Sequence, residues 1–316
     1  MAAKPNILVY SANEADKYAD FLRSAGYTSI STATTPEEAA GRLAETEILF
    51  CWKFPTHLLT QPEAARLRWI QSMGAGVEDL VRDKKIPEDI VLTRIVGQFG
   101  APIAEYVFAY LLYLCKNIPR MRRAQVNHAW DSFVPGTLYG KTIGVAGLGS
   151  IGSEIARKAR AFDMKVHGLA FSGHSANVVD KHYTSREWKD FVQELDYLVL
   201  ALPLTDETQY VVNRDVLFCM KRGAGLINIG RGKLIKETDL VEVIESGHLG
   251  PVILDVFEHE PLASDSLLWS LPNVYVTPHL SGPSIVESVS QFFRENLELY
   301  RRGLPLNGVV NRQAGY

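Results

Sequence analysis

The stretch that decides the fold is Thr142–Gly152, TIGVAGLGSIG. Its first five residues form a short β-branched run, which predicts a buried strand, and its glycines follow at the spacing G-x-G-x-x-G. The next segment, Ser153–Met164, carries apolar residues at helical spacing and predicts a helix. Strand, glycine turn and helix in this order favour a unit that binds a dinucleotide. The plain alternative is a glycine-rich turn without a ligand.

Each glycine of this turn has its own expected task. Gly147 allows the tight turn, Gly149 lets the backbone approach a pyrophosphate, and Gly152 lets the helix pack closely on the strand. Ser150 and Ile151 then lie where the helix begins, and the free N–H groups and positive dipole end of a helix N-terminus attract phosphate. We therefore expect these five residues to bind the cofactor.

The composition is that of an ordinary soluble globular protein. The chain has 316 residues, of which 47% are hydrophobic and 22% charged, and its formal net charge is −3. This charge gives no electrostatic reason to expect nucleic acid or an anionic membrane as a partner. The N-terminal residues lack the layout of a signal peptide, so a cytoplasmic protein is expected. The cysteines lie far apart and the histidines lack metal-ligand spacing, so we expect no disulfide and no metal.

Strands and helices alternate on both sides of the glycine turn, which predicts an α/β protein with two doubly wound parallel-sheet domains. We expect a discontinuous, flavodoxin-like substrate domain made of residues 1–97 and 283–316. A Rossmann cofactor domain, residues 98–282, is inserted in it. Residues 106–115 are apolar on every side, so a helix there is expected to be buried all round, at a domain junction or a subunit interface. Pro119 is expected to interrupt or kink this helix.

Three late strands, GLINI, VIL and NVYV, are each followed by a side chain that can carry chemistry. These side chains are Arg231, Glu260 and His279, in that order. In open α/β sheets, ligands bind outside the carboxyl ends of the strands. An arginine, a carboxylate and a histidine are therefore expected at the same sheet edge as the glycine turn.

These motifs make the chain resemble the D-isomer-specific 2-hydroxyacid dehydrogenases. The resemblance extends from Gly74 to about Asn296 and depends on TIGVAGLGSIG, NIGRG, DVFEHEPL and TPHLSG together. The length and the ending VVNRQAGY are most similar to the glyoxylate/hydroxypyruvate reductase branch. Two rivals are disfavoured: formate dehydrogenases pair their histidine with a glutamine, where this chain has Glu260, and phosphoglycerate dehydrogenases often carry a further regulatory domain, for which this chain is too short.

The resemblance implies His279 as the acid–base residue, Glu260 as its partner and Arg231 as the group that binds the substrate carboxylate. The chemistry of these side chains agrees with those roles. Histidine titrates near neutral pH, a neighbouring carboxylate favours its protonated form, and the planar fork of arginine matches a carboxylate. The alternatives are a loop histidine, a surface arginine and a solvated glutamate. Glu258 and His259 are expected to be exposed neighbours of Glu260.

Other residues are assigned to binding alone. Backbone N–H groups of Ala75 and Gly76 are expected to hold the substrate carboxylate as an anion nest. Trp52 and Lys53 are expected to line the same site, with core packing and a solvated amine as their alternatives. For the cofactor, the resemblance implies four further residues. A helix cap or an ion pair is the alternative for one of them, Asp255. The four are Pro203, Thr208, Ile229 and Asp255.

The segment after the strand that follows the glycine turn bears on the choice of cofactor. NAD-binding units place an Asp or Glu about 20 residues beyond the turn to hold the ribose 2′-OH. Lys165–Ser175 contains no acidic residue, so the group that would repel a 2′-phosphate is missing. The usual arginine is missing as well, and Ser172 is expected to supply a donor instead. We therefore expect NADP in preference to NAD.

Together these observations predict NAD(P)H-dependent reduction of a short 2-keto acid to the D-2-hydroxy acid. Glyoxylate and hydroxypyruvate are the expected substrates. A homodimer is expected from the apolar segment 106–115 and from the resemblance. The alternative is a dinucleotide-sensing binding protein, similar to transcriptional corepressors that share this fold and retain the same arginine, glutamate and histidine.

Overall fold

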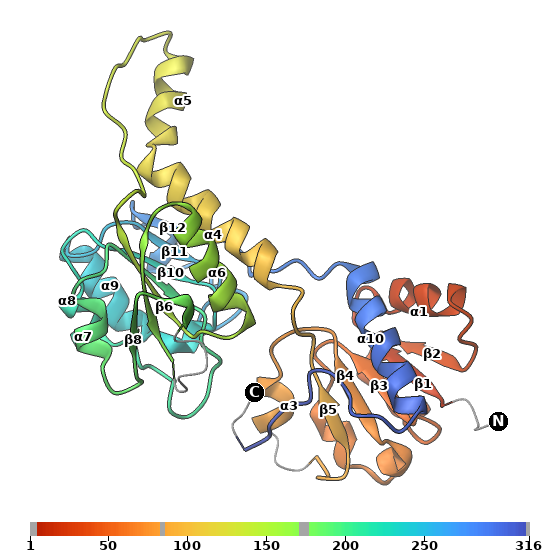
Figure 1. Ribbon diagram of the computed structural model, residues 1–316. Helices are drawn as coiled ribbons and strands as arrows, with labels where there is room; N and C mark the ends of the chain where they lie inside the picture. The colour runs from red at the N-terminus through yellow and green to blue at the C-terminus, as the bar shows by residue number, and fades with distance from the viewer. Residues whose placement is uncertain (1–4, 83–85, 171–176, 314–316) are drawn as a thin grey trace. The chain divides into compact units, whose positions relative to one another are not determined.

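The computed structural model describes residues 5–82, 86–170 and 177–313 (Figure 1). The chain divides into two units, each compact in itself. Unit 1 is made of Met1–Gln98 and Ser284–Tyr316, and unit 2 is the segment Phe99–Pro283 between them.

Unit 1 is built on an open parallel sheet. In its described residues the strand order is β2-β1-β3-β4-β5, the order of a flavodoxin-like doubly wound sheet. Its elements are β1 (Ile7–Tyr10), α1 (Ala15–Ser24), β2 (Ile30–Ala33), α2 (Pro36–Leu43), β3 (Ile48–Cys51), the 3₁₀ helices η1 (Thr56–Thr60) and η2 (Pro62–Arg66), β4 (Trp69–Ser72), α3 (Glu78–Arg82), β5 (Val91–Thr93) and α10 (Val286–Arg301).

Helix α10 supplies part of the core of unit 1, although it comes almost 200 residues after β5. The Phe293 ring stacks on the Phe50 ring, with centroids 4.3 Å apart, and on the Trp69 ring at 5.2 Å. The buried Asn296 side chain donates from Nδ2 to Gln71 Oε1 at 3.1 Å. The sheet formed by the first hundred residues therefore completes its core with a helix from the end of the chain.

Unit 2 is also an open parallel sheet. In its described residues the order is β12-β11-β10-β9-β6-β7-β8, which is the Rossmann order counted from β6, with one strand added. Its elements are α4 (Gly100–Cys115), α5 (Ile118–Val126), β6 (Thr142–Ala146), α6 (Ser150–Ala161), β7 (Lys165–Leu169), β8 (Lys181–Tyr183), α7 (Trp188–Val192), β9 (Tyr197–Leu200), α8 (Arg214–Cys219), β10 (Gly225–Asn228), the 3₁₀ helix η4 (Gly232–Leu234), α9 (Glu237–Glu245), β11 (Val252–Leu254), the 3₁₀ helix η5 (Leu267–Trp269) and β12 (Val274–Val276).

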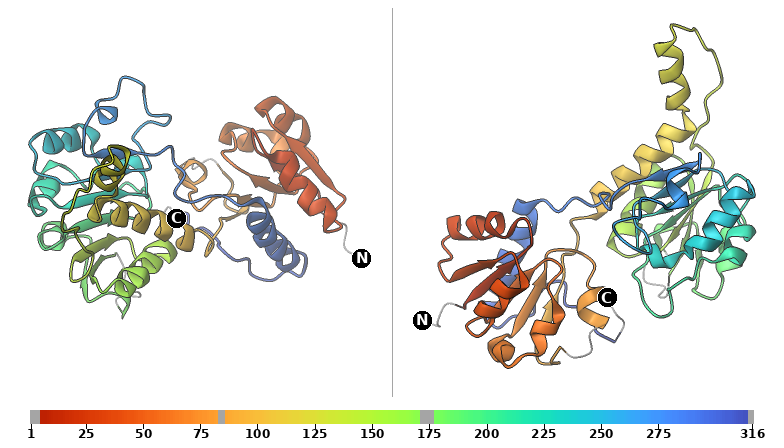
Figure 2. Two further views of the ribbon diagram at one scale, coloured as in Figure 1. Left: turned by 90° about the horizontal axis from the view of Figure 1, so that it is seen from above. Right: turned by 180° about the vertical axis from the view of Figure 1, so that it is seen from behind.

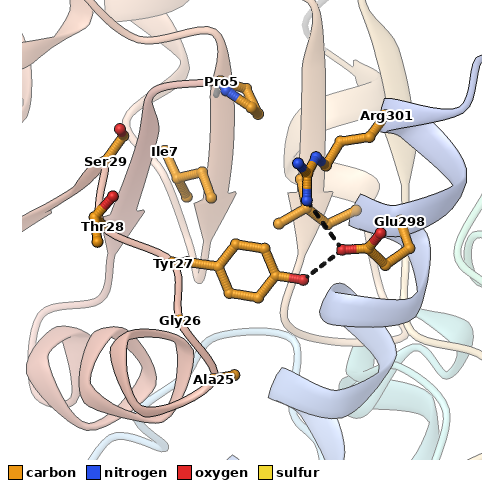
Figure 3. A pocket seen from close by; sticks show the side chains of 10 residues that line it. Pro5, Ile7, Ala25, Gly26, Tyr27, Thr28, Ser29, Glu298 and Arg301 are labelled. Carbon is orange, nitrogen blue, oxygen red and sulfur yellow. Dashed lines mark hydrogen bonds and ion pairs between the residues drawn. The ribbon is translucent and has the colours of Figure 1, made fainter. Parts of the chain in front are cut away.

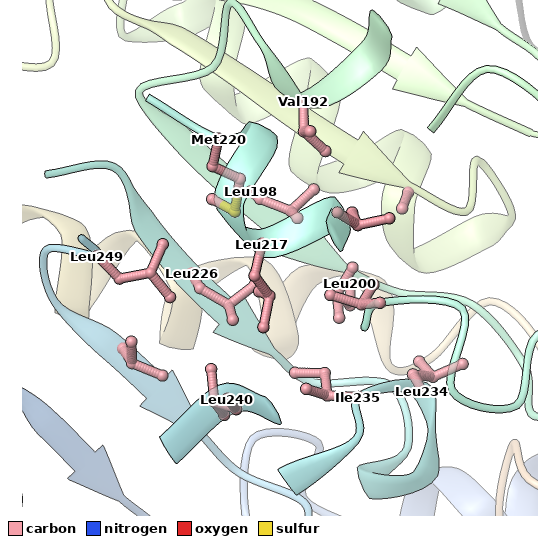
Figure 4. Packing of buried hydrophobic residues seen from close by; sticks show 14 of the residues in the cluster. Val192, Leu198, Leu200, Leu217, Met220, Leu226, Leu234, Ile235, Leu240 and Leu249 are labelled. Carbon is pink, nitrogen blue, oxygen red and sulfur yellow. The ribbon is translucent and has the colours of Figure 1, made fainter. Parts of the chain in front are cut away.

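Helices cover both faces of this sheet. Helices α4 and α6 lie together on one face, and α7, α8 and α9 lie on the other (Figures 1 and 2). Leucines of β9 and β10 pack there against apolar side chains of α8 and α9, as Figure 4 shows for Leu198, Leu226, Leu217 and Leu240. Strands buried on both faces read as continuous apolar runs, which is why they could be found from the sequence.

Helix α4 is buried on one side and exposed on another within this chain. Its Val107, Phe108 and Leu111 are buried, whereas Tyr113 on the other side is 40% exposed. Unit 2 covers α4 where it packs on α6 and where its tyrosines contact Tyr275 and Thr277, and the helix is not buried all round within one chain. Among the described residues, none forms a helix both long and apolar enough to span a membrane.

Pro119 does not kink α4. Helix α4 ends at Cys115, and Asn117 then adopts a left-handed backbone conformation with φ 52°. Pro119 lies in the first turn of the separate helix α5, where its missing N–H removes no helical hydrogen bond. All nine residues of α5 are described, and none of them is buried.

Candidate active site

The three residues expected to carry the chemistry follow three neighbouring strands of unit 2. Arg231 follows β10, Glu260 follows β11 and His279 follows β12. All strand pairs of this sheet are parallel, so these residues lie along one edge, which also carries the glycine turn after β6. The edge is the position at which ligands bind in open α/β sheets.

His279 and Glu260 form a hydrogen-bonded pair. His279 Nδ1 lies 2.8 Å from Glu260 Oε2, and the two side chains are 43% and 29% exposed. The backbone N–H of Phe257 donates to the other oxygen, Glu260 Oε1, at 3.2 Å. The carboxylate thus fixes the ring through Nδ1, and Nε2 is the nitrogen that remains for a ligand.

The loop that carries His279 is held by a buried carboxylate. Asp255 is fully buried, and its oxygens accept hydrogen bonds from Thr277 Oγ1 at 2.6 Å and from the N–H groups of Leu280 and Ser281 at 2.9 Å. A buried carboxylate is costly unless it is hydrogen-bonded, and three donors satisfy this one. The helix cap or ion pair considered for Asp255 is therefore not what the structure contains.

The backbone at His279 is itself unusual. His279 has φ 53°, in the left-handed region that residues other than glycine rarely adopt, and its N–H donates to the Asp255 carbonyl oxygen at 2.9 Å. Helix α4 contributes to the same arrangement, because the Tyr106 hydroxyl bonds to Thr277 Oγ1 at 2.7 Å. Burial raises the pKa of Tyr106, which therefore stays neutral. Strained backbone held in place by surrounding contacts is frequent at active sites.

The turn that carries Arg231 is held by the amide of Asn228, which is buried at the end of β10. Asn228 Nδ2 donates to the Arg231 carbonyl oxygen at 3.0 Å, and Asn228 Oδ1 accepts from the N–H of Gly230 at 3.1 Å. The Arg231 guanidinium donates from Nη1 to the carbonyl oxygen of Gly230 at 2.6 Å. Asn228 was not among the expected site residues, although a polar side chain within an apolar strand is a signal that could have indicated it.

The glycine turn after β6 has the geometry that a pyrophosphate requires. Gly147 has φ 97°, and a Cβ on Gly152 would lie 1.8 Å from the carbonyl oxygen of Gly147, so helix and turn touch through their backbones. A Cβ on Gly149 would meet no atom within 4 Å, and Gly149 and Ser150 are exposed. Open space above the N-terminus of α6, where Ile151 also lies, fits the phosphates of a dinucleotide.

The other residues expected to bind the cofactor lie outside the glycine turn. The buried Thr208 hydroxyl donates to the Pro203 carbonyl oxygen at 2.7 Å and accepts from the Thr205 N–H at 2.8 Å, so it closes its own loop. Ile229 is buried directly after β10. Ser172 lies outside the described residues.

In unit 1, the expected substrate-binding residues follow the adjacent strands β3 and β4. The Trp52 ring lies against Gly74, where a Cβ would come within 2.2 Å of it, and the tryptophan is still 39% exposed. The structure thus brings Trp52 next to the loop that continues into Ala75 and Gly76. Lys53 has φ 49°, a second residue in the left-handed region at a sheet edge.

Glu258 corrects another expectation, because it is not an exposed neighbour of Glu260. Its Oε2 accepts a hydrogen bond from the Tyr210 hydroxyl at 2.9 Å, and its Oε1 accepts one from the Glu237 N–H at 2.7 Å. The partners lie 48 and 21 residues away, and no local sequence pattern predicts them. His259 is exposed, as expected.

A hollow of about 160 Å³ lies elsewhere in unit 1, between α10 and the segment that joins α1 to β2 (Figure 3). Tyr27 donates from its hydroxyl to Glu298 Oε1 at 2.8 Å, and Arg301 pairs with the same oxygen at 3.3 Å. These side chains satisfy one another, and none of the expected site residues lines the hollow. Among the described residues, no group of three or more His, Cys, Asp or Glu side chains could hold a metal ion.

Residues 108–281 match the protein family described as "D-isomer specific 2-hydroxyacid dehydrogenase, NAD binding domain". A D-3-phosphoglycerate dehydrogenase of Bacillus subtilis is 33% identical over 78% of this chain, which spans 48% of that protein. A glyoxylate reductase of Pyrococcus horikoshii is 31% identical over 79% of this chain and 78% of that protein.

Solved structures of the same family resemble this chain along nearly its whole length. An NADPH-dependent glyoxylate/hydroxypyruvate reductase from Sinorhizobium meliloti, in complex with NADP and sulfate, matches with a TM-score of 0.88 and 28% identity over 99% of this chain and 100% of that one. The chain therefore belongs to the D-isomer specific 2-hydroxyacid dehydrogenase family and is an NAD(P)-dependent oxidoreductase. The expected fold class and family are confirmed, including similarity to the glyoxylate/hydroxypyruvate reductase branch.

Proposed function

We propose that this protein reduces a short 2-keto acid, glyoxylate or hydroxypyruvate, to the D-2-hydroxy acid. The observation that carries the proposal is the 2.8 Å pair of His279 and Glu260, beside Arg231 at the dinucleotide edge of the sheet. Reduction of a keto group needs a hydride on carbon and a proton on oxygen. The reduced nicotinamide supplies the hydride when it is bound, and the protein has to supply the proton and the orientation.

His279 is the proposed proton donor. In its protonated form, Nδ1–H donates to Glu260 and Nε2–H points the second proton toward the keto oxygen. The carboxylate stabilises the positive ring and keeps it in one orientation. When Nε2 gives up its proton, the ring becomes neutral and keeps its bond to Glu260.

Each unit, considered by itself, contains groups that we propose bind the substrate. Arg231 offers a planar, permanently charged guanidinium that matches the substrate carboxylate with two parallel bonds. The N–H groups of Ala75 and Gly76 bind carboxylate oxygens, and Trp52 packs against the small carbon chain.

The proposed cofactor is NADPH. The glycine turn and the first residues of α6 hold the pyrophosphate, as their open geometry supports. Pro203, Thr208 and Ile229 are assigned to the loops beside it, and Ser172 is assigned to the 2′-phosphate. Asp255 is assigned a place near the nicotinamide through the loop of His279, which its buried carboxylate holds. The NADP of the S. meliloti relative supports this choice. The kcat/KM values for NADPH and NADH, compared at one keto acid and low salt, test it; a clear preference for NADH would contradict it.

The decisive experiment is a turnover assay that follows nicotinamide absorbance with a panel of 2-keto acids and both cofactors. Reduction of glyoxylate or hydroxypyruvate is the expected result. Binding of the dinucleotide without turnover of any keto acid would favour the dinucleotide-sensing alternative instead.

We also propose that two copies of the chain associate through unit 2. The uncovered face of α4 continues into α5 and the loop after it, which extend away from the sheet (Figure 1). Trp130 and Val134 in this loop are 99% and 95% exposed, and a bidentate pair between Arg120 and Asp131, with bonds of 2.6 and 2.7 Å, fixes the loop on α5. An ordered apolar surface of this kind is typical of an interface.

Sedimentation velocity tests the dimer. At micromolar concentration the protein should sediment at twice the chain mass of 35.2 kDa, and a Trp130→Ser, Val134→Ser variant should shift toward the monomer. A wild-type protein that sediments only as the single chain would refute the proposal.

A further inference from the structure

Glu258 connects three loops at the edge of the sheet in unit 2. It lies in the loop after β11, its Oε2 accepts from Tyr210 in the loop after β9, and its Oε1 accepts from the N–H of Glu237 beyond the loop after β10. We propose that Glu258 is a positioning residue, whose carboxylate fixes Arg231 relative to the pair of Glu260 and His279. This inference builds on the proposed function, which gives those three residues their roles.

The link between the loops after β10 and β11 is reciprocal. The Glu237 N–H donates to Glu258 Oε1 at 2.7 Å, and the Glu258 N–H donates to Glu237 Oε1 at 2.6 Å. Glu237 begins α9, so the Glu258 carboxylate also binds one of the free N–H groups at a helix N-terminus. Two carboxylates that each bind the backbone of the other residue hold two chain segments in one fixed register.

Backbone contact reinforces this link immediately beside Arg231. A Cβ on Gly232 would lie 1.8 Å from the carbonyl carbon of Phe257 and 2.4 Å from the nitrogen of Glu258. The backbone at Gly232 and the backbone at residues 257–258 therefore cannot move closer together. The carboxylates of Glu237 and Glu258 keep them from moving apart. Burial raises the pKa of Glu237, and the negative charge of Glu258 adds to this rise, whereas the bond from the Glu258 N–H opposes it. The two carboxyl groups are therefore close enough to influence one another.

Tyr210 adds the third loop. Its φ is 54°, unusual for an aromatic residue, and its N–H donates to the Lys233 carbonyl oxygen at 2.7 Å. Its hydroxyl donates to Glu258, and this hydrogen bond raises the pKa of the phenol. The loop that contains Thr208 is thereby attached to the loops after β10 and β11, which carry Arg231 and Glu260.

The path from Glu258 to the proton donor is short. Glu258 follows Phe257, whose N–H donates to Glu260 Oε1, and Glu260 Oε2 holds the ring of His279. A shift of residues 257–258 would therefore displace the acid–base pair and the Arg231 turn relative to one another. Misplacement by about 1 Å can lower a rate by about 100-fold, so a residue that touches no substrate can still control turnover.

The test measures kcat and KM for glyoxylate, and the Kd for NADPH, in wild type, Glu258→Ala and Glu258→Gln. Glu258→Ala should lower kcat and raise KM about 10-fold each, with the NADPH Kd changed less than about threefold. Glu258→Gln should recover most of both losses. Its amide oxygen can accept from the Glu237 N–H and its amide N–H can donate to the Tyr210 oxygen, so both contacts survive without the charge.

Two further variants keep the test decisive if Glu258→Ala does not fold. Tyr210→Phe removes one hydrogen bond to Glu258 and should raise KM about threefold. Glu245→Ala, an exposed glutamate at the end of α9, is the matched control and should change nothing. A folded Glu258→Ala with unchanged kcat and KM would overturn this inference alone, as would a loss of thermal stability without a change in either constant. A wild-type protein that reduces no keto acid would overturn it together with the proposed function.

Discussion

The two units share one architecture and differ at the edges of their sheets. In unit 1 the edge after β3 and β4 is shaped by packing, with the Trp52 ring against the backbone of Gly74. In unit 2 the edge is joined by carboxylates: Asp255 holds the His279 loop, Glu260 holds the ring, and Glu258 joins three loops. In the proposed function, the proton transfer assigned to unit 2 requires fixed hydrogen-bond geometry, whereas the apolar substrate contact assigned to Trp52 requires only shape. The difference teaches that one fold can serve either purpose through the residues that follow its strands.

Loss of the acid–base group should have the largest effect. His279→Ala removes the proposed proton donor, and turnover should fall by about 100-fold or more while NADPH still binds. His57→Ala, an exposed histidine in unit 1, serves as the control and should leave kcat unchanged. Steady-state kinetics together with nucleotide titration measure both quantities. Near-normal turnover in His279→Ala would show that the sheet edge of unit 2 does not supply the proton, and would contradict the difference drawn between the two units.

The glycine turn provides the next largest effect, this time on folding. Gly152→Ala places a methyl group against the backbone oxygen of Gly147, which cannot move aside, so the free energy of unfolding should fall by about 2 kcal/mol. Gly149→Ala meets open space and should keep wild-type stability while weakening the binding of NADPH. Urea unfolding and NADPH titration separate the two results. Equal stability of the two variants would show that the close approach at Gly152 is not a constraint.

A glycine of unit 1 sharpens the comparison. Gly74→Ala also creates a clash, but its partner is the ring of Trp52, a side chain that is partly exposed and can rotate. The loss of stability should therefore be smaller, about 1 kcal/mol, while the KM for glyoxylate rises because the ring is displaced. The control is Gly41→Ala in α2, where a Cβ meets no atom within 4 Å. A KM that stays at its wild-type value would argue against Trp52 and Gly74 as part of the substrate site.

The smallest expected effect concerns acid stability. His167 in β7 is buried, its Nδ1 lacks a hydrogen-bond partner within the described residues, and burial lowers its pKa below the ordinary value of 6.5. The unfolded chain therefore binds a proton more readily. The contribution of His167 to stability is fully present above pH 6.5 and is lost as the pH falls through its lowered folded-state pKa.

His167→Gln removes this titration and should flatten the dependence of unfolding free energy on pH. Identical pH slopes for wild type and His167→Gln would mean that burial of this ring does not cost proton affinity.

The sequence predicted the features that depend on local pattern. Apolar strands, the glycine turn and the cap of α2, where Thr35 accepts from the Glu38 N–H, all follow from neighbouring residues. His279, Glu260 and Arg231 were found because each lies in the stretch after a late strand, within a motif that resembles the family. The role of Glu258 was not found, because its hydrogen bonds to Tyr210 and Glu237 join segments that are distant in sequence.

Helix α10 has a consequence for the order in which the chain folds on the ribosome. The strands of unit 1 are synthesised first, but Phe293 and Asn296, which fill its core, are added only after all of unit 2 has been made. Unit 2 has its complete set of strands and helices by residue 283. The sheet of unit 1 therefore cannot cover Trp69 and Phe50 with α10 until all of unit 2 has been synthesised, whereas unit 2 needs no later segment to complete its own elements.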